Sequence, residues 1–205
     1  MKADAVSLST LSDTRPVAGA LPASESPDRV GRVLTRAQAG DRAAFRELIC
    51  TYQARIYSLA LRMLGVREDA QELAQDVFVI LHRHLPKIVS VAHLGAWLRK
   101  AVCHRAIDRL RSRPRHIALP LDAADEQEAP RQDGDPILEG HLRQLIASLP
   151  PIPRSVVLLR YQEDLDPSEI AEALGVPLNT VKSHLRRSLA LIRARCAPWR
   201  GDKRQ

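Results

Sequence analysis

The sequence feature that most constrains the fold is the stretch 165–195, in which two helical patterns are joined by a Gly-Val-Pro tripeptide. In the first pattern Asp166 stands at the N-cap position, a proline follows at the first helical position, and Glu169 has the spacing of a capping box. Gly175 suits the left-handed conformation that ends a helix and turns the chain. The stretch therefore predicts a helix-turn-helix.

The second helix of this unit has one apolar and one polar face. Val181, Leu185 and Leu189 recur at helical spacing and are expected to pack inward. The other face suits the major groove of DNA. An ordinary antiparallel helix pair with a solvated basic face is the alternative, but the cap and the turn glycine favour DNA binding. The candidate DNA-contact residues on this face are Asn179, Thr180, Lys182, Ser183, His184, Arg186 and Arg187.

The charge of the whole chain also points to a polyanionic partner. The 205 residues carry a formal net charge of +7, which suits a protein that binds nucleic acid. No apolar run has the length of a membrane span or the uninterrupted core of a signal peptide. We therefore expect a cytoplasmic protein without membrane insertion.

No residue pattern indicates catalysis, a metal or a cofactor. Cys50, Cys103 and Cys196 are odd in number, far apart and outside any Cys/His ligand spacing, so we expect buried, reduced thiols. No glycine-rich phosphate loop, paired carboxylate site or recognisable nucleophile–base arrangement stands out. We expect no catalytic residues, no metal site and no cofactor.

Helical periodicity runs through most of the chain without sustained two-residue alternation, so we expect an all-α protein of two small helical domains. The segment between them is rich in Asp, Glu and Pro, which predicts an acidic flexible linker. The expected organisation is a disordered tail at 1–28, a helical domain at 29–113, the linker at 114–136, a four-helix domain with the helix-turn-helix at 137–197, and a basic tail at 198–205.

Local signals mark the helix ends in the first domain. Gly40 ends a short first helix, Asp41 caps the second, and Gly65 ends it. The third and fourth helices are expected at about 67–84 and 94–112, with a loop at 87–93 between them.

Two faces of this domain carry charge. The outer side of the third helix holds Glu72, Gln75 and Asp76, for which a solvated acidic face is the simplest explanation. The fourth helix includes Trp97, whose spacing predicts that it is mainly buried, while its other positions are densely basic. This density fits a track for a phosphate backbone. The basic residues are Arg99, Lys100, Arg105, Arg109, Arg111, Arg113 and Arg115.

Three segments together resemble one family. The C-terminal segment LPPIPRSVVLLRYQEDLDPSEIAEALGVPLNTVKSHL and the upstream segments DAQELAQDVF and WLRKAVCHRAIDRLR resemble the ECF (extracytoplasmic-function) sigma factors of the sigma-70 family. The resemblance covers about 30–196. It implies a bacterial RNA polymerase initiation subunit made of sigma domains 2 and 4. The implied partners are the clamp helices and flap of core RNA polymerase, promoter DNA and an anti-sigma factor.

The resemblance also implies a role for each charged group. The segment that docks on the polymerase clamp helices in the family matches Asp69, Glu72, Gln75 and Asp76. The family helix that reads and helps to melt the -10 promoter element matches a set made of Trp97, Arg99, Lys100, His104, Arg105, Asp108 and Arg109. The loop at 87–93 lies where the family holds a flipped base, and the helix from Leu178 lies where the family reads the -35 element.

The chain departs from the family pattern at several positions. The family commonly has Asn at His104, an aromatic residue and Arg at Leu94 and Gly95, Gly at Asn179, and Arg at His184. The alternative function is an autonomous helix-turn-helix regulator. Such a regulator would be expected to carry a ligand pocket or a self-complementary apolar stripe, and we find neither pattern in the sequence.

Overall fold

The computed structural model describes residues 26–112 and 136–200, with the backbone alone at 136–139 and 198–200. This part of the chain is built from helices and contains no strand, so the expected all-α class is confirmed. The elements are α1 (Pro27–Gln38), α2 (Arg42–Leu64), α3 (Arg67–His84), the short 3-10 helix η2 (Leu85–Lys87), α4 (Val91–Ser112), α5 (Pro136–Ala147), α6 (Pro151–Tyr161), α7 (Pro167–Leu174) and α8 (Leu178–Arg200).

The helix ends of the N-terminal half follow the expected local signals. The Asp41 side chain accepts hydrogen bonds from the backbone amides of Ala43 and Ala44 at 2.8 and 3.1 Å. Gly65 ends α2 in the left-handed conformation, with φ 76°. The predicted cap and stop of the second helix are therefore confirmed.

The connection between α3 and α4 is shorter than predicted. Within the expected loop at 87–93, Lys87 belongs to η2 and residues 91–93 form the first turn of α4. The Ser90 hydroxyl accepts a hydrogen bond from the His93 amide at 3.0 Å, and His93 Nδ1 accepts one from the Val89 amide at 3.2 Å. Because Ser90 caps the helix in this way, α4 begins at Val91 and not near residue 94.

The C-terminal half contains the predicted helix-turn-helix. Asp166 accepts hydrogen bonds from the Ser168 and Glu169 amides at 2.7 and 2.9 Å, and the Glu169 carboxylate accepts one from the Asp166 amide at 2.7 Å. Gly175 ends α7 in the left-handed conformation, with φ 65°. The predicted capping box and turn glycine are confirmed, and α7 and α8 form the two helices of the motif.

Three predicted boundaries meet the structure only in part. Residues 27 and 28 of the predicted tail belong to α1, which starts at Pro27, a residue favoured at the first helical position. The rest of that segment, residues 1–25, lies outside the described residues. The predicted linker also lies outside them, except that Pro136 begins α5. Helix α8 continues to Arg200, into the predicted basic tail, and cations near a helix C-terminus favour such an extension.

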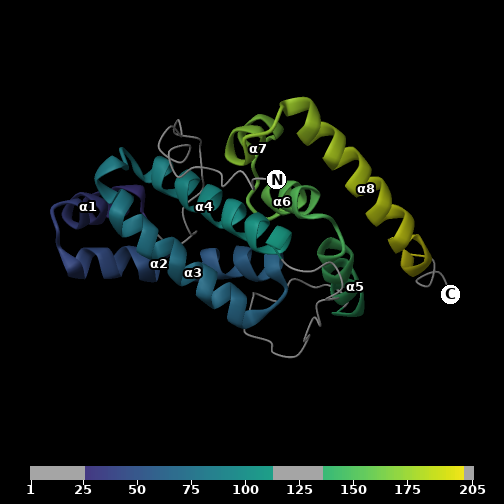
Figure 1. Ribbon diagram of the computed structural model, residues 1–205, viewed down its shortest axis with the longest axis horizontal. Coiled ribbons are helices and arrows are strands. Elements are labelled where there is room, and N and C mark those ends of the chain that lie inside the picture. The colour runs from purple at the N-terminus through teal and green to yellow at the C-terminus, as the bar shows by residue number, and fades with distance from the viewer. Residues whose placement is uncertain (1–25, 113–135, 201–205) are drawn as a thin grey trace.

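The two halves of the molecule share one hydrophobic core. Helices α6 and α7 pack against α4, and α5 and α6 pack against α2 (Figure 1). Met63 of the N-terminal half and Leu159 of the C-terminal half belong to the same cluster of buried residues. Helix α8 packs on α5, α6 and α7 and runs along the outer side of the C-terminal half (Figure 1).

Arg154 on α6 forms a buried polar link between the halves. Its guanidinium donates to the carbonyl oxygen of Met63 at 2.5 Å, at the C-terminal end of α2, and also to the carbonyl oxygens of Ala147 and Leu149. Burial lowers the pKa of Arg154 to about 10, so the side chain stays charged at neutral pH. A charged donor thereby satisfies a carbonyl at the end of α2 that lacks a partner within the helix.

Replacing Gly175 with Ala tests the turn of the helix-turn-helix. A Cβ atom at this position would meet no atom within 4 Å, so only the left-handed backbone conformation opposes it. We expect a loss of about 1 kcal/mol in the free energy of unfolding, measured by urea denaturation. Gly140→Ala is the matched control: its Cβ also has open space, but Gly140 lies inside α5, where Ala should stabilise the helix. Destabilisation of the same size by both substitutions would contradict the assignment.

Candidate nucleic-acid interface

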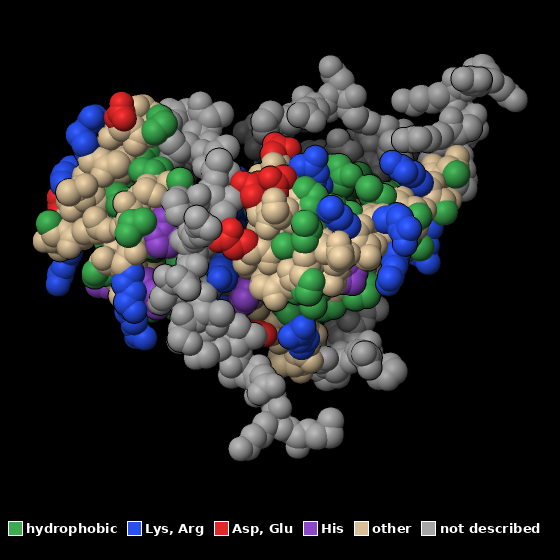
Figure 2. Space-filling view, turned by 90° about the horizontal axis from the view of Figure 1, so that it is seen from above, with side chains coloured by type: hydrophobic (Ala, Val, Ile, Leu, Met, Phe, Trp, Pro, Cys, Tyr) green, Lys and Arg blue, Asp and Glu red, His purple; other side chains and the backbone are tan. Residues whose placement is uncertain are grey.

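Helix α8 presents its cations to solvent. Val181 and Ser188 are buried, on the side of α8 that packs on the rest of the C-terminal half. Lys182, Arg186 and Arg187 are exposed, and Figure 2 shows Lys and Arg side chains along this end of the molecule. Of the other candidate residues, Asn179 is exposed, while Thr180, Ser183 and His184 are half-buried. The structure thus places the expected -35 residues on one helix with the charged groups outermost.

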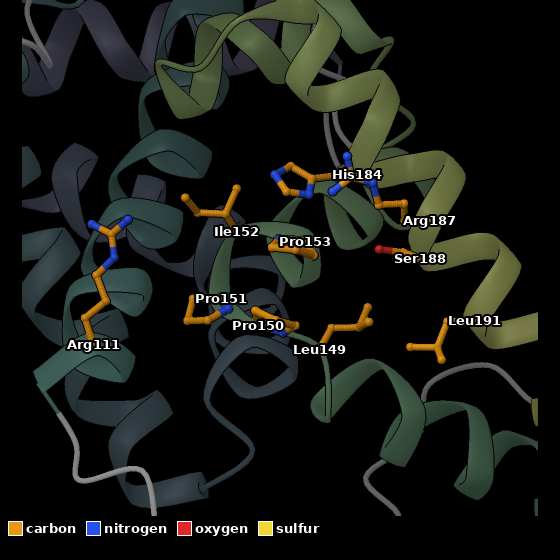
Figure 3. A pocket seen from close by; sticks show the side chains of 10 residues that line it. All are labelled: Arg111, Leu149, Pro150, Pro151, Ile152, Pro153, His184, Arg187, Ser188 and Leu191. Atoms are coloured by element: carbon orange, nitrogen blue, oxygen red, sulfur yellow. The ribbon is translucent and has the colours of Figure 1, made fainter.

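A groove that the sequence analysis missed runs beside α8. It has a volume of about 600 Å³ and separates α8 from the start of α6 and the end of α4. In Figure 3 the His184 side chain reaches from α8 over Pro153, and Arg111 lies on the opposite side. The sequence signal that could have indicated the groove is the spacing of three or four residues between His184, Ser188 and Leu191, which places these groove residues on one face of α8. The lining residues are Arg111, Leu149, Pro150, Pro151, Ile152, Pro153, His184, Arg187, Ser188 and Leu191.

The basic face expected on α4 is partly covered. Arg99 and Lys100 are only 3% and 6% exposed, because α6 and α7 pack against α4. The prediction that Arg99 and Lys100 are exposed for contact with a phosphate backbone is therefore wrong for this arrangement of the chain. Trp97 is 1% exposed, which confirms the burial predicted from its spacing, and its ring lies 5.4 Å from that of His84. The remaining -10 candidates are the half-buried His104, Arg105 and Arg109 and the exposed Asp108.

Polar groups of the C-terminal half lie beside the covered part of α4. Burial lowers the pKa of Arg99, and the nearby charge of Glu163 opposes that shift. Glu163 also accepts a hydrogen bond from Arg55 Nε on α2 at 2.9 Å. His104 Nε2 lies 3.1 Å from the carbonyl oxygen of Ala173 on α7, and burial lowers the pKa of this imidazole. Several polar groups of the predicted -10 surface are therefore engaged within the chain.

Arg109 joins two of the predicted sites. Its Nη2 lies 2.8 Å from Asp76 Oδ2, its Nη1 lies 3.2 Å from Glu72 Oε2, and it donates to the carbonyl oxygen of Asp69 at 3.3 Å. Glu72 and Asp76 are therefore not only solvated, because α4 packs beside α3 and brings Arg109 into ion pairs with both carboxylates. Glu72 and Gln75 nevertheless remain exposed, and Asp76 is half-buried.

The thiols differ from the sequence expectation. Only Cys103 is buried, and burial raises its pKa to about 12, whereas Cys50 is exposed on α2 and Cys196 is half-buried near the end of α8. No group of three His, Cys, Asp or Glu side chains that could hold a metal ion occurs among the described residues. Within 26–112 and 136–200, no helix has the length and apolarity to cross a membrane.

Two sequence families match the chain, one in each half. The family "Sigma-70 region 2" covers residues 48–116, and "Sigma-70, region 4" covers residues 140–192. The first match includes α3 and α4 with their charged groups, and the second includes the helix-turn-helix.

Individual proteins of known family are similar to most of the chain. The RNA polymerase sigma-E factor of Streptomyces avermitilis is 30% identical over 159 residues, which are 75% of this chain and 86% of the relative. The ECF RNA polymerase sigma factor SigW of Bacillus subtilis is 27% identical over 173 residues, which are 78% of this chain and 92% of the relative. The solved structure of CnrH in complex with the cytosolic domain of CnrY shares the fold: the match covers 84% of this chain and 99% of the matched chain, with a TM-score of 0.59 and 19% identity. The chain therefore belongs to the ECF sigma factors of the sigma-70 family, the subunits with which RNA polymerase recognises promoters.

Proposed function

We propose that the chain is a non-catalytic initiation subunit that brings core RNA polymerase to promoters with separate -10 and -35 elements. The observation that carries the proposal is the exposed basic face of α8 on a capped helix-turn-helix. The same chain supplies a second charged unit, α3 and α4, within the matched region 2. No bound cofactor is needed for this role, and it belongs in the cytoplasm, where the polymerase meets the chromosome.

In the proposed -35 contact, different residues of α8 bind the DNA backbone and read the bases. Lys182, Arg186 and Arg187 neutralise phosphates, which positions the helix on the duplex without reading the sequence. Hydrogen bonds to base edges in the major groove then supply specificity. The proposed base-reading residues are drawn from Asn179, Thr180, Ser183 and His184.

Arg187→Ala tests the phosphate-contact role. Binding should weaken alike for all promoter variants, and the salt dependence of log Kd should flatten by about 0.9, the value for one lost phosphate contact. Replacing a base-reading residue such as Asn179 should instead change the preference between sequences by about 1–3 kcal/mol. Fluorescence anisotropy with duplexes at several salt concentrations measures both effects.

The control for this experiment is Arg46→Ala, which removes an exposed arginine from α2 and should leave both quantities unchanged. If Arg187→Ala altered sequence preference while leaving the salt slope as it was, phosphate contact would be the wrong role for Arg187.

The proposed polymerase contact lies on α3. Asp69, Glu72, Gln75 and Asp76 form it, and the exposed carboxylate of Glu72 suits a cationic partner surface. The proposed -10 contact lies next to it, at the connection before α4 and on α4 itself. Arg105 and Arg109 are partly accessible there, whereas Trp97, Arg99 and Lys100 are not.

Replacing Glu72 and Gln75 together with Ala tests the polymerase surface. Affinity for core RNA polymerase should fall, while the melting temperature should change little, because exposed polar groups contribute little to stability. Glu68→Ala is the matched control, since Glu68 is an exposed carboxylate in the first turn of the same helix. Normal core binding with a large loss of thermal stability would reverse the assignment.

We also propose that an anti-sigma factor controls the chain. The solved CnrH structure holds that protein in complex with the cytosolic domain of CnrY. The family resemblance supports the same kind of partner for this chain, bound so that it competes with core RNA polymerase.

A further inference from the structure

Glu163 occupies an unusual place for a carboxylate. It lies in the short connection between α6 and α7, and its side chain is only 1% exposed. Its Oε2 lies 2.5 Å from Arg55 Nη2 and accepts a hydrogen bond from Arg55 Nε at 2.9 Å. Arg55 belongs to α2, so an anion of the C-terminal half is held by the forked cation of the N-terminal half.

The cations of α4 are buried in the same interface. Arg99 is 3% exposed and Lys100 is 6% exposed, and Arg99 lies within the electrostatic reach of Glu163. Burying a cation is unfavourable unless an anion compensates for the lost hydration. Glu163 is such an anion for Arg99, at the surface where the proposed -10 contact requires a DNA phosphate.

We propose that Glu163 substitutes for a DNA phosphate at the -10 surface and that its ion pair with Arg55 keeps the free chain closed. The inference rests on the proposed function, since it concerns when this surface can meet DNA. In the closed chain α6 and α7 cover Arg99 and Lys100, and moving them away from α4 exposes both cations to a DNA backbone.

Closure affects the two proposed DNA contacts unequally. Lys182, Arg186 and Arg187 on α8 are exposed in the same structure that buries Arg99 and Lys100. The closed chain can therefore hold a -35 duplex while its -10 surface is unavailable. Separation of the halves becomes the step that admits the -10 strand.

Glu163→Gln in the full chain tests the proposal, because it removes the charge and keeps nearly the same shape. Small-angle X-ray scattering should show a larger radius of gyration. Affinity for a fluorescent oligo(dT), chosen because phosphate contacts are independent of sequence, should rise about tenfold if the open fraction rises from about a tenth to nearly all. The salt dependence should steepen by about 0.7 for each phosphate contact that Arg99 and Lys100 gain.

Glu47→Gln is the matched control. It also removes a carboxylate from a pair with arginine, the 2.7 Å contact between Arg29 and Glu47, but this pair is more exposed and lies within the N-terminal half. It should change neither the scattering nor the affinity for oligo(dT). Adding Lys100→Gln to Glu163→Gln should remove part of the gain and so assign it to α4.

A -35 duplex serves as an internal reference, because its affinity for α8 should be the same in the wild type and in Glu163→Gln. If Glu163→Gln disturbs the C-terminal half and that affinity falls, Arg55→Gln breaks the same ion pair from the other side and should open the chain with α8 intact. A larger radius of gyration without higher affinity for oligo(dT) would contradict the claim that closure blocks DNA from Arg99 and Lys100. An unchanged radius of gyration in both variants would contradict the claim that the ion pair keeps the chain closed. Failure of the proposed function has a different signature, namely no transcription with core RNA polymerase by either wild type or variant, whatever the scattering shows.

Discussion

The packing of α6 and α7 against α4 determines which charged surfaces of this sigma factor are accessible. The two halves share one hydrophobic cluster, and two polar links also join the C-terminal half to α2, at Arg154 and at the Arg55–Glu163 pair. A buried ion pair of this kind is weak evidence for added stability, because desolvation offsets most of the Coulomb attraction. The ion pair has a greater effect on how the two halves are arranged, because separating them within the interface would leave a charged group there without its partner, which is unfavourable. These contacts therefore fix one arrangement of the two halves, in which α6 and α7 cover part of α4.

The charged groups of the N-terminal half form a connected set. Arg109 reaches from α4 to Glu72 and Asp76 on α3, so the proposed polymerase contact and the proposed -10 contact share an ion-pair cluster. A partner that engages the α3 carboxylates changes the surroundings of Arg109 directly. Helix α8, by contrast, rests on its own half and keeps its cations in solvent. The proposed -35 surface is thus exposed in the structure, whereas the exposure of the proposed -10 surface depends on contacts with the C-terminal half.

The features that the sequence predicted correctly are local ones. The capping box at Asp166, the cap at Asp41 and the left-handed glycines at Gly65 and Gly175 depend on residues only a few positions apart, and the apolar spacing that placed Trp97 inside is equally local. The burial of Arg99 and Lys100 depends on a contact with residues far along the chain, which no local pattern reveals. The same is true of the reach of Arg109 to α3 and of the groove beside α8. Ser90 was a local signal that the prediction of a loop at 87–93 did not take into account. Its hydroxyl caps α4, so that the helix begins at Val91.

The central claim, that this chain serves core RNA polymerase in opening promoters, is tested most directly by permanganate probing of unpaired thymines. Unstacking bases costs free energy that α4 has little means of offsetting alone, because its one tryptophan, Trp97, is buried. The account predicts that thymines of the -10 element become reactive only when the chain and core polymerase are both present, and that Arg105→Ala reduces this reactivity more than it reduces core binding. Tight and specific duplex binding by the isolated chain, with no effect of added core polymerase, would contradict the account and favour an autonomous regulator.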